Sequence, residues 1–524
     1  MANGSLDFDA CYRALETRDA RFDGRFFTGV TSTGIYCRPV CPASTPRRKN
    51  VRFFAHAAAA ARAGFRPCRR CRPESAPGTP AWIGTAATVS RALRLIGEGA
   101  LDGDDGVETL ARRLGVGPRH LSRLFARHLG ASPIAVAQTR RVHFARALLE
   151  SSDHPISRLA FCAGFQSVRR FNAAMRDAFA MSPSEMRRTG PAPGGTIEFR
   201  LAYRPPYDWD TILAFLRARA IPGVEDADES AYRRTFSIGE TTGTIKVAHE
   251  PEARALRLRV LAPPSRDLME VVERTRRLFD LGADPLRIQE TLLRDPRLRP
   301  LVKERPGLRV PGAWAPFETA VRAILGQQVS VAAATTLAGR LARTFGTPLE
   351  GAPGLTHVFP RPEALESAAL EPALPLPTAR AAAIRALARA LRLGDVNLDA
   401  PASLDEAIER LRKLPGFGDW TAHTVALRVL GEPDAFPAGD LGIKKALGLE
   451  SARDVLRVAE AWRPWRAYAA LHLWNSSPLN ATPKRTSHAN RNSRHADRPD
   501  HPDRGRGRKK AARTQSPSRR SATA

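Results

Sequence analysis

The sequence predicts a multidomain protein that is mainly α-helical with α+β parts. A length of 524 residues allows three or four domains, and a hydrophobic content of 43% is enough for several cores. Stretches rich in Pro, Gly and Ser interrupt the chain at residues 74–80 and 189–196, and aliphatic residues become rare from residue 475 onward. We therefore predict five segments, with the bounds 1–78, 81–188, 196–267, 268–474 and 475–524.

The charge of the chain indicates a polyanionic partner. The formal net charge is +29 and the pI is about 11.1, which most simply indicates nucleic acid. Part of this charge lies in residues 475–524, which hold 13 Lys and Arg against 3 Asp and almost no aliphatic residues. Such a basic tail cannot bury a core, so we expect it to be disordered.

The cysteine content and the hydropathy pattern indicate a soluble cytoplasmic protein. Only six cysteines occur, and four of them stand in close pairs, which fits a reducing compartment better than a disulfide framework. The first residues lack the basic and then apolar pattern of a signal peptide, and no apolar run is long enough to span a bilayer. We expect no membrane partner and a location in the cytoplasm, associated with the nucleoid.

Four cysteines in segment 1–78 predict a metal site, and they are Cys37, Cys41, Cys68 and Cys71. The spacings C-x3-C and C-x2-C, with 26 residues between the pairs, suit one tetrahedral Zn²⁺ per chain. The arginines between and beside them suggest a thiolate cluster that lies against a phosphate backbone; they are Arg38, Arg66, Arg69, Arg70 and Arg72. The spacing alone equally allows a purely structural zinc knuckle.

The runs STGIYCRP at residues 32–39 and GFRPCRRC at residues 64–71 extend this prediction. Through them, residues 26–73 resemble the N-terminal domain of the Ada family, bacterial sensors of alkylated DNA. The resemblance implies that Cys37 is both a zinc ligand and the acceptor of a methyl group from a DNA phosphotriester. It also implies that Thr33 and Arg66 contact DNA. Pro42 and Ser44 depart from the pattern, because the family commonly has arginines there.

Methylation of Cys37 would also change the electrostatics of the site. Four thiolates on Zn²⁺ leave about two net negative charges, and a methylated sulfur loses its charge. Repulsion from DNA phosphates would then fall and affinity would rise, because the backbone term dominates DNA binding. The expected site is therefore a sensor that responds to its own repair reaction.

Segment 81–188 carries two helix–turn–helix patterns. In the first, a helix ends near Leu114, and Pro118 begins a second helix after a glycine turn. In the second, Gly164 marks the turn, and Cys162 falls on the apolar face, where it should pack in the core. The exposed residues that we expect to bind DNA are Arg119, His120 and Arg123 in the first pattern and Gln166, Ser167 and Arg169 in the second.

Each pattern resembles half of an AraC-type DNA-binding domain, whose second motif ends as MSPSEMRR does at residues 181–188. The resemblance implies that two recognition helices enter successive stretches of the major groove. Without this resemblance, a plain helical bundle would be the alternative.

Ada-type regulators usually add a second methyltransferase domain with a PCHR run, but this chain has no cysteine after Cys162. Repair of O6-alkylguanine is therefore not expected.

Segments 196–267 and 268–474 together predict a small α+β lobe followed by a helical domain. The stretch LPGFGDWTA at residues 414–422 reads as helix, glycine turn and helix, and such a turn can hold a DNA phosphate on its backbone N–H groups. A simple helical hairpin remains the alternative for that stretch alone. With FPAGDLGIK at 436–444, AVRAILGQQVS at 320–330 and WRPWRAYAALHLW at 462–474, the region resembles the AlkA-type 3-methyladenine-DNA glycosylase II of the helix–hairpin–helix superfamily.

That resemblance implies a role for each matching residue. Asp440 would be the catalytic carboxylate, which stabilises positive charge on the deoxyribose or aligns the attacking water. The matching base pocket holds Trp420, Trp474 and Thr424, and Gln328 stands where a leucine wedge fills the gap left by the extruded base. The best-known type has tyrosine at the position of Thr424, so we expect a different base preference here. Gly416 and Gly418 would bind DNA in the hairpin.

Absent residues narrow the expected chemistry. The C-terminal half has no cysteine cluster for an iron–sulfur centre, and Trp420 holds the position of the lysine that strand-cutting relatives use. We therefore predict a monofunctional glycosylase that needs no cofactor and leaves an abasic site.

The whole sequence predicts alkylation repair combined with transcription regulation. Its expected partners are damaged double-stranded DNA, promoter DNA and RNA polymerase, and we expect a monomer. One alternative is a regulator whose glycosylase region only anchors DNA. Another is an enzyme whose zinc and helical segments only target it. Variants of Asp440 and Cys37 would separate these alternatives.

Overall fold

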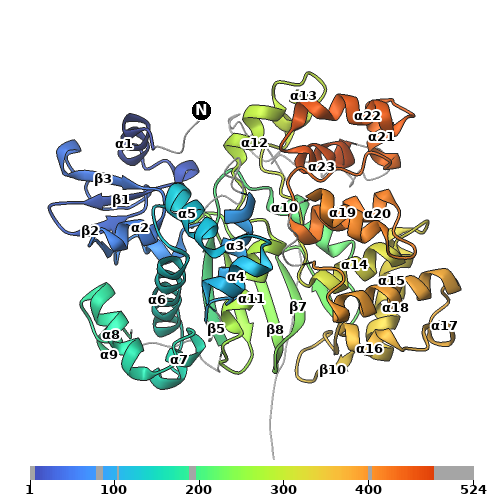
Figure 1. Cartoon of the computed structure of the whole chain (residues 1–524), viewed down its shortest axis with the longest axis horizontal. Coiled ribbons are helices and arrows are strands. Elements are labelled where there is room, and N and C mark those ends of the chain that lie inside the picture. Colours follow the sequence, from blue (N-terminus) through green and yellow to red (C-terminus); the bar gives the residue numbers. More distant parts are fainter. Residues whose placement is uncertain (1–5, 78–86, 103–105, 188–195, 399–403, 477–524) are drawn as a thin grey trace, which may run out of the picture. The chain divides into compact units, whose positions relative to one another are not determined.

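The structure, a computed structural model, describes residues 6–77, 87–102, 106–187, 196–398 and 404–476 (Figure 1). The prediction of a disordered tail concerns residues that lie outside this range, apart from 475 and 476. Within the described residues, no helix has both the length and the apolar character that a membrane span requires.

The segment with the paired cysteines forms a four-stranded sheet in the order β3-β1-β2-β4. Strand β1 pairs antiparallel with β2 and β3, and β2 pairs parallel with the short strand β4. This parallel pair brings Cys37, the last residue of β2, close to Cys68, which follows β4. The elements are α1 (Phe8–Glu16), β1 (Phe27–Val30), β2 (Ile35–Cys37), β3 (Val51–Phe54), α2 (Ala57–Arg62) and β4 (Arg66–Pro67), with 3-10 turns at Ala20–Phe22, Arg48–Asn50 and Pro73–Ser75.

The next segment is helical, as predicted. Leu114 caps the first helix of the first helix–turn–helix, and Pro118 occupies the first turn of its second helix. Cys162 is buried in the apolar core, also as predicted. The helices are α3 (Ala87–Gly97), α4 (Val107–Arg113), α5 (Pro118–Leu129), α6 (Pro133–Ser151), α7 (Ile156–Cys162), α8 (Val168–Phe179) and α9 (Pro183–Met186). The long helix α6 connects the two helix–turn–helix units.

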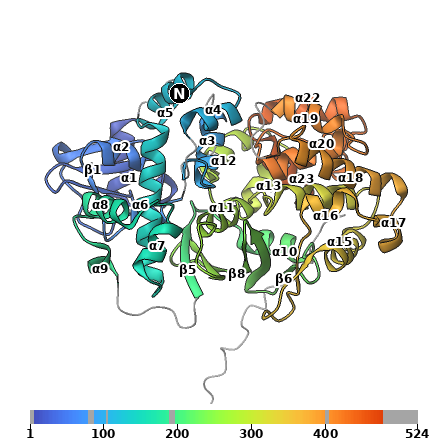
Figure 2. The ribbon, with the colours of Figure 1, turned by 60° about the horizontal axis from the view of Figure 1, so that its bottom comes forward.

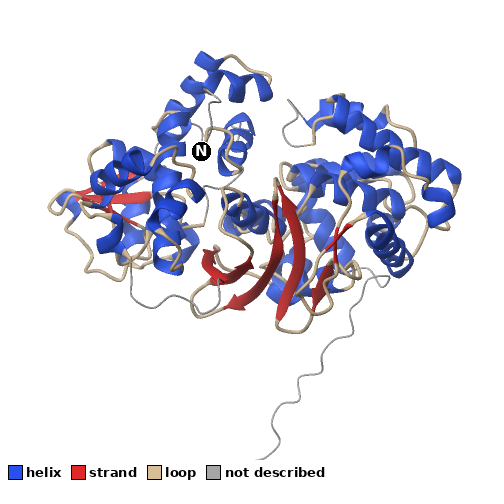
Figure 3. Ribbon diagram, turned by 90° about the horizontal axis from the view of Figure 1, so that it is seen from below, coloured by secondary structure: helices blue, strands red, loops and turns tan. Residues whose placement is uncertain are grey.

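The α+β lobe is built on a five-stranded antiparallel sheet in the order β5-β9-β8-β7-β6, whose curved strands are red in Figure 3. Strands β5 and β8 largely alternate between buried and more exposed side chains, as expected when one face packs on a core, whereas β7 is mostly buried along its whole length. The elements are β5 (Thr196–Ala202), α10 (Trp209–Arg217), β6 (Glu225–Ala227), β7 (Ala231–Ile238), β8 (Thr241–Glu250) and β9 (Ala255–Leu261).

Helices follow from Leu268, where the sequence pattern predicts them. Helices α18 to α23 lie together in two views (Figures 1 and 2) and share one apolar core. The first group comprises α11 (Leu268–Leu278), α12 (Pro285–Leu292), α13 (Arg299–Glu304), α14 (Pro316–Leu325), α15 (Val331–Phe345), α16 (Pro362–Glu366) and α17 (Leu370–Ala373), with short strands β10 (Thr347–Pro348) and β11 (His357–Val358). The second comprises α18 (Thr378–Leu393), α19 (Leu404–Arg412), α20 (Asp419–Val425), a π-helical turn η4 (Ala426–Leu430), α21 (Leu441–Leu447), α22 (Ala452–Ala459), a 3-10 turn (Glu460–Trp462) and α23 (Arg466–Ser476).

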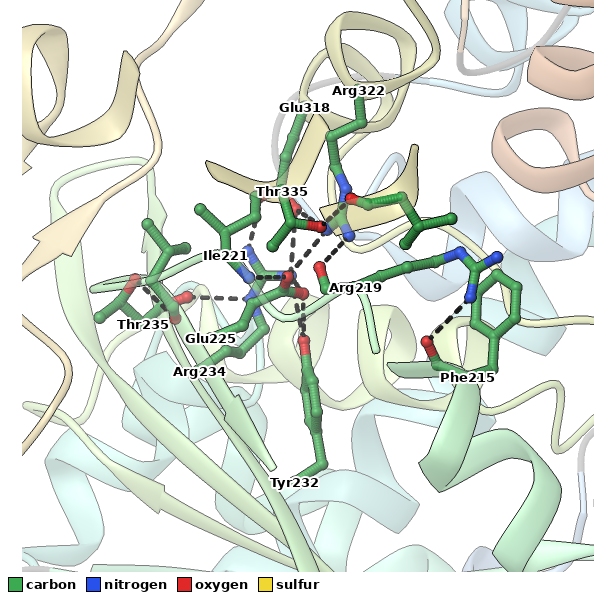
Figure 4. Close-up of polar contacts among 12 residues, drawn as sticks. Phe215, Arg219, Ile221, Glu225, Tyr232, Arg234, Thr235, Glu318, Arg322 and Thr335 are labelled. Carbon is green, nitrogen blue, oxygen red and sulfur yellow. Dashed lines mark hydrogen bonds and ion pairs between the residues drawn. The ribbon is translucent and has the colours of Figure 1, made fainter. Parts of the chain in front are cut away.

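A buried ionic network joins the sheet to α14 (Figure 4). Arg234 of β7 donates to Glu318 of α14 at 2.7 Å, and Arg322 of α14 donates to Glu225 of β6 at 2.8 Å. The hydroxyl of Tyr232 donates to the same Glu225 at 2.6 Å. Because an unpaired buried charge is costly, this network fixes α14 against the sheet.

Candidate functional sites

The four predicted cysteines meet in one cluster. Their sulfur atoms all lie within 4.8 Å of one another, and all four residues are buried. A Zn–S bond of about 2.3 Å places tetrahedral sulfurs roughly 3.8 Å apart, and the Cys41 and Cys68 sulfurs lie 3.9 Å apart. The backbone N–H of Arg38 also donates to the Cys71 sulfur at 3.3 Å. The chemistry and size of this donor set therefore fit zinc.

The arginines around the cluster do not share one orientation. The guanidinium of Arg38 is largely buried, forms an ion pair with Asp23 and donates to the Cys71 carbonyl at 3.0 Å. Arg72 forms an ion pair with Glu150 at 2.7 Å. The expectation that the arginines face a phosphate backbone is thus wrong for Arg38, because the protein uses it internally. The remaining members, Arg66, Arg69 and Arg70, are exposed, and so is Thr33 in the turn between β1 and β2.

The first helix–turn–helix presents a polar face from α5. Arg119, His120 and Arg123 are exposed there, and the Arg123 guanidinium lies 2.9 Å from Nδ1 of His120. The opposite face of α5 buries Leu121 and Phe125. This separation of faces leaves the predicted DNA-binding side chains free to reach a groove.

The second helix–turn–helix uses its predicted residues in different ways. Gln166 and Arg169 are exposed at the start of α8. Ser167 is partly buried, and its hydroxyl caps α8 by accepting the backbone N–H of Arg170 at 3.2 Å. The local structure of Ser167 is therefore explained by helix capping. Phe171 lies on the buried face of the same helix.

Asp440 is anchored by three N–H donors. Its Oδ1 accepts the backbone N–H of Ile443 at 3.1 Å, which makes it the N-cap of α21, and the indole N–H of Trp474 at 2.9 Å. Its Oδ2 accepts the indole N–H of Trp420 at 2.9 Å. Asp440 remains partly exposed. The result is a carboxylate of fixed orientation between two indoles, which can stabilise positive charge that develops beside it.

A glycine hairpin directly precedes α20, the helix that carries Trp420. Gly416 has φ +76° in the turn, and Gly418 caps α20. The side-chain amide of Gln327 donates to the Gly416 carbonyl at 2.8 Å and to the Thr421 hydroxyl at 3.0 Å. It therefore ties the hairpin to the turn after α14. The next residue, Gln328, is exposed at φ +55°, at the tip of that turn.

Family models match most of the chain. Residues 10–74 match the metal binding domain of Ada, and residues 110–189 match a helix-turn-helix domain. Residues 198–315 match the AlkA N-terminal domain, and residues 321–450 match the HhH-GPD superfamily base excision DNA repair protein.

A probable bifunctional transcriptional activator/DNA repair enzyme AlkA from Mycobacterium tuberculosis is 44% identical over 492 residues, which are 91% of this chain and 98% of that protein. This chain belongs to the family of that protein, the bifunctional AlkA family. DNA-3-methyladenine glycosylase 2 of Escherichia coli is 38% identical over 53% of this chain and 96% of its own length. The bifunctional transcriptional activator/DNA repair enzyme Ada of Escherichia coli is 32% identical over 35% of this chain and 50% of its own length.

Membership of the bifunctional AlkA family confirms the predicted fusion of an Ada-type regulator with an AlkA-type glycosylase. It also confirms the multidomain fold and a single zinc site. The structure brings Asp440, Trp420 and Trp474 into one hydrogen-bonded group. Thr424 lies one turn after Trp420 on the same helix, and its hydroxyl is buried without a hydrogen-bond partner among the described residues.

Two residues near Asp440 and the glycine hairpin, Gln327 and Gly442, are not predicted from the sequence. Gln327 stands beside the predicted Gln328, but only the fold shows that it joins the hairpin. A Cβ atom on Gly442 would lie 3.1 Å from Oδ1 of Asp440 and 3.3 Å from Cδ1 of Trp474. Its position in the stretch DLGIK, two residues after the aspartate, is the one signal that the sequence offers. A small residue at 442 therefore keeps the carboxylate and the indole together.

Proposed function

We propose that this member of the bifunctional AlkA family repairs alkylated DNA and regulates transcription in response to the damage. The observation that carries the proposal is the Asp440 carboxylate, held by Trp420 and Trp474 in a helix–hairpin–helix domain. The zinc-type cysteine cluster and the paired helix–turn–helix units add the sensing and regulatory parts.

The repair reaction is the hydrolytic release of bases of the 3-methyladenine and 7-methylguanine class. Their N3 or N7 alkylation makes the base cationic and a good leaving group, so little acid catalysis is required. As the N-glycosidic bond breaks, positive charge grows on the deoxyribose and Asp440 stabilises it. The base leaves as a neutral molecule with the electron pair of that bond. Water then adds to the sugar carbon and releases one proton to the solvent, and an abasic site remains. The three N–H donors hold the carboxylate in place, so it need not reorient during the reaction.

Base extrusion is the second requirement of this reaction. We assign the base pocket to the indoles of Trp420 and Trp474, with Thr424 as a third residue, because electron-poor methylated bases stack well on indole. Gln328, exposed at the tip of its turn, enters the space that the base leaves. Backbone N–H groups near Gly416 and Gly418 hold a DNA phosphate without sequence preference.

The zinc site accepts a methyl group at Cys37. The Cys37 sulfur attacks the methyl carbon of a phosphotriester, an S–C bond forms, and the C–O bond breaks. The electron pair of that bond stays on oxygen, so the backbone regains its negative charge while the sulfur loses its own. Bound Zn²⁺ would supply the chemistry that keeps the four cysteine sulfurs deprotonated. Thr33 and Arg66, both exposed near the cluster, contact the DNA backbone.

The regulatory part acts on promoter DNA. Arg119, His120 and Arg123 on α5 read one stretch, and Gln166 and Arg169 at the start of α8 read the next. Ser167 caps α8 and supports its first turn there. We further propose that the protein acts as a monomer in the cytoplasm, on the nucleoid, and that it contacts RNA polymerase.

The decisive test is release of bases from methylated duplex DNA by the purified protein. Wild type should release 3-methyladenine and should not cut the strand. Asp440→Asn should reduce release by about 100-fold or more, since a charge-stabilising group is lost, while DNA binding remains. Asp419→Asn, an exposed aspartate on the neighbouring helix α20, is the matched control and should keep the wild-type rate. No release by wild type would instead favour a regulator whose glycosylase region only anchors DNA.

A further inference from the structure

Arg146 connects the helical segment to the cysteine cluster. It lies on α6 and is only 2% exposed to solvent. Its guanidinium donates to the backbone carbonyls of Cys68 at 3.3 Å and of Arg69 at 3.2 Å. Cys68 is one of the four clustered cysteines, so Arg146 holds the backbone of the metal knuckle directly.

The same guanidinium also reaches the second helix–turn–helix. It lies over the ring of Phe179, 5.3 Å from the ring centroid. Phe179 is the last residue of α8, the helix that begins beside Gln166 and Arg169, and it is buried in the core of that unit. One side chain therefore touches both the knuckle and the helix that we assign to DNA reading.

The position of Arg146 is strongly constrained. Two carboxylates compensate its charge, Glu74 at 3.3 Å and Glu150 at 3.4 Å. A buried cation with several partners is costly to displace, because each lost partner leaves an uncompensated charge. The guanidinium is consequently a rigid connection between the groups it binds.

Two more contacts attach α6 to the cluster. The hydroxyl of Tyr36 lies 2.8 Å from Nε2 of His143, and Tyr36 directly precedes Cys37. Arg72, directly after Cys71, forms an ion pair with Glu150 at 2.7 Å. Both arms of the cluster, the end of β2 and the knuckle at residues 68–72, are thus held by one face of α6.

We propose that Arg146 is a positioning residue that couples the zinc site to the second helix–turn–helix. The proposal rests on the zinc site of the proposed function. A change in the ligand set shifts the knuckle carbonyls, and Arg146 then loses its fixed place beside Phe179. Because coupling between two sites is reciprocal, the intact contact also stabilises the metal-bound knuckle. DNA reading by α8 thereby responds to the state of the cluster through packing, in addition to net charge.

Hydrogen exchange by mass spectrometry on the full chain tests this coupling. Exchange is followed in residues 168–179 with zinc bound and after a chelator has removed it. In wild type, zinc removal should speed exchange of these residues about threefold or more, because a stabilising contact is released. In Arg146→Met, the ratio of the two rates should fall to about one. Phe179→Leu, which removes the ring from the other side of the contact, should lower the ratio as well.

Arg141→Met is the matched control. Arg141 lies on the same helix, but its guanidinium binds Asp102 and the Leu101 carbonyl instead of the knuckle. This variant should keep the wild-type ratio. The zinc content of each protein is measured first, by atomic absorption. A wild-type chain without zinc would overturn the proposed metal site and the coupling with it. Two results would overturn the coupling alone. One is a zinc-loaded wild type in which residues 168–179 exchange at the same rate with and without zinc. The other is an Arg146→Met variant whose ratio of the two rates equals that of wild type.

Discussion

The indole Nε1 of Trp474 lies 2.9 Å from Oδ1 of Asp440 and donates a hydrogen bond to it. Trp474 belongs to α23 and Asp440 caps α21, so this bond joins two helices at the candidate active site. Because a hydrogen-bonded carboxylate cannot rotate freely, the indole serves both as a pocket wall and as an orienting donor.

Trp474→Phe separates these two roles. Phenylalanine keeps an aromatic face but lacks the N–H donor, so Asp440 would lose one of its three donors. We expect single-turnover release of 3-methyladenine to slow about tenfold, which corresponds to the loss of one hydrogen bond that orients a reacting group. The melting temperature of the protein should change little, because Trp474 is only partly buried. An unchanged rate would mean that the ring alone matters.

Gly442→Ala tests the packing around the same pair. The added methyl group would lie 3.1 Å from Oδ1 of Asp440 and 3.3 Å from Cδ1 of Trp474, and would force them apart. Since a displacement of this kind misplaces the catalytic group, we expect the rate to fall about tenfold or more. Gly439→Ala is the control, because a Cβ atom there meets nothing within 4 Å. Equal rates for the two variants would contradict the assignment of Asp440.

Zinc analysis tests the metal site without any activity. The purified chain should hold one zinc ion, and Cys41→Ala should lose most of it, since three thiolates bind a structural zinc far less tightly than four. Cys11→Ala changes a buried cysteine of the same segment that lies outside the cluster and should keep its zinc. Base release should be the same in both variants if the two halves act separately.

The glycosylase domain should lose stability at mildly acidic pH through His472. Burial, together with the nearby charge of Arg305, lowers the pKa of His472 to about 4, from 6.5 for an ordinary histidine. Between these two values the unfolded chain binds a proton that the folded chain does not, so stability falls as pH drops from 6.5 toward 4. At pH 5 the loss is about 2 kcal/mol.

Urea unfolding of wild type and His472→Gln at pH 8 and pH 5 measures this effect. The variant should be less sensitive to pH than wild type, even if it is less stable at pH 8. Parallel pH dependence in the two proteins would show that His472 binds its proton equally well in the folded and the unfolded chain. The comparison uses the difference between two proteins, so other titrating groups cancel.

The sequence predicts those parts of the molecule that local patterns determine. Cysteine spacing predicts the metal cluster, and the helix start at Leu268 follows from the change in periodicity. Contacts between distant residues leave no such pattern. Gln327 bonds to Gly416, 89 positions away, and Arg38 pairs with Asp23 although its neighbours suggested a DNA-facing role. Side-chain direction in a small zinc domain depends on how the turns pack, and residue spacing does not report it.

The network of Arg234, Glu225, Glu318 and Arg322 has a consequence for dividing the molecule. Cutting the chain near residue 268 would separate Arg234 and Glu225 from Glu318 and Arg322. Charged side chains that are buried in the intact protein would then meet solvent on both fragments. Each fragment would carry stranded charges, together with the apolar area around them. A glycosylase module moved to another protein must therefore begin at the first strand of the sheet, near residue 196. The sheet and the helical domain therefore have to be transferred together, whether by recombination or by protein engineering.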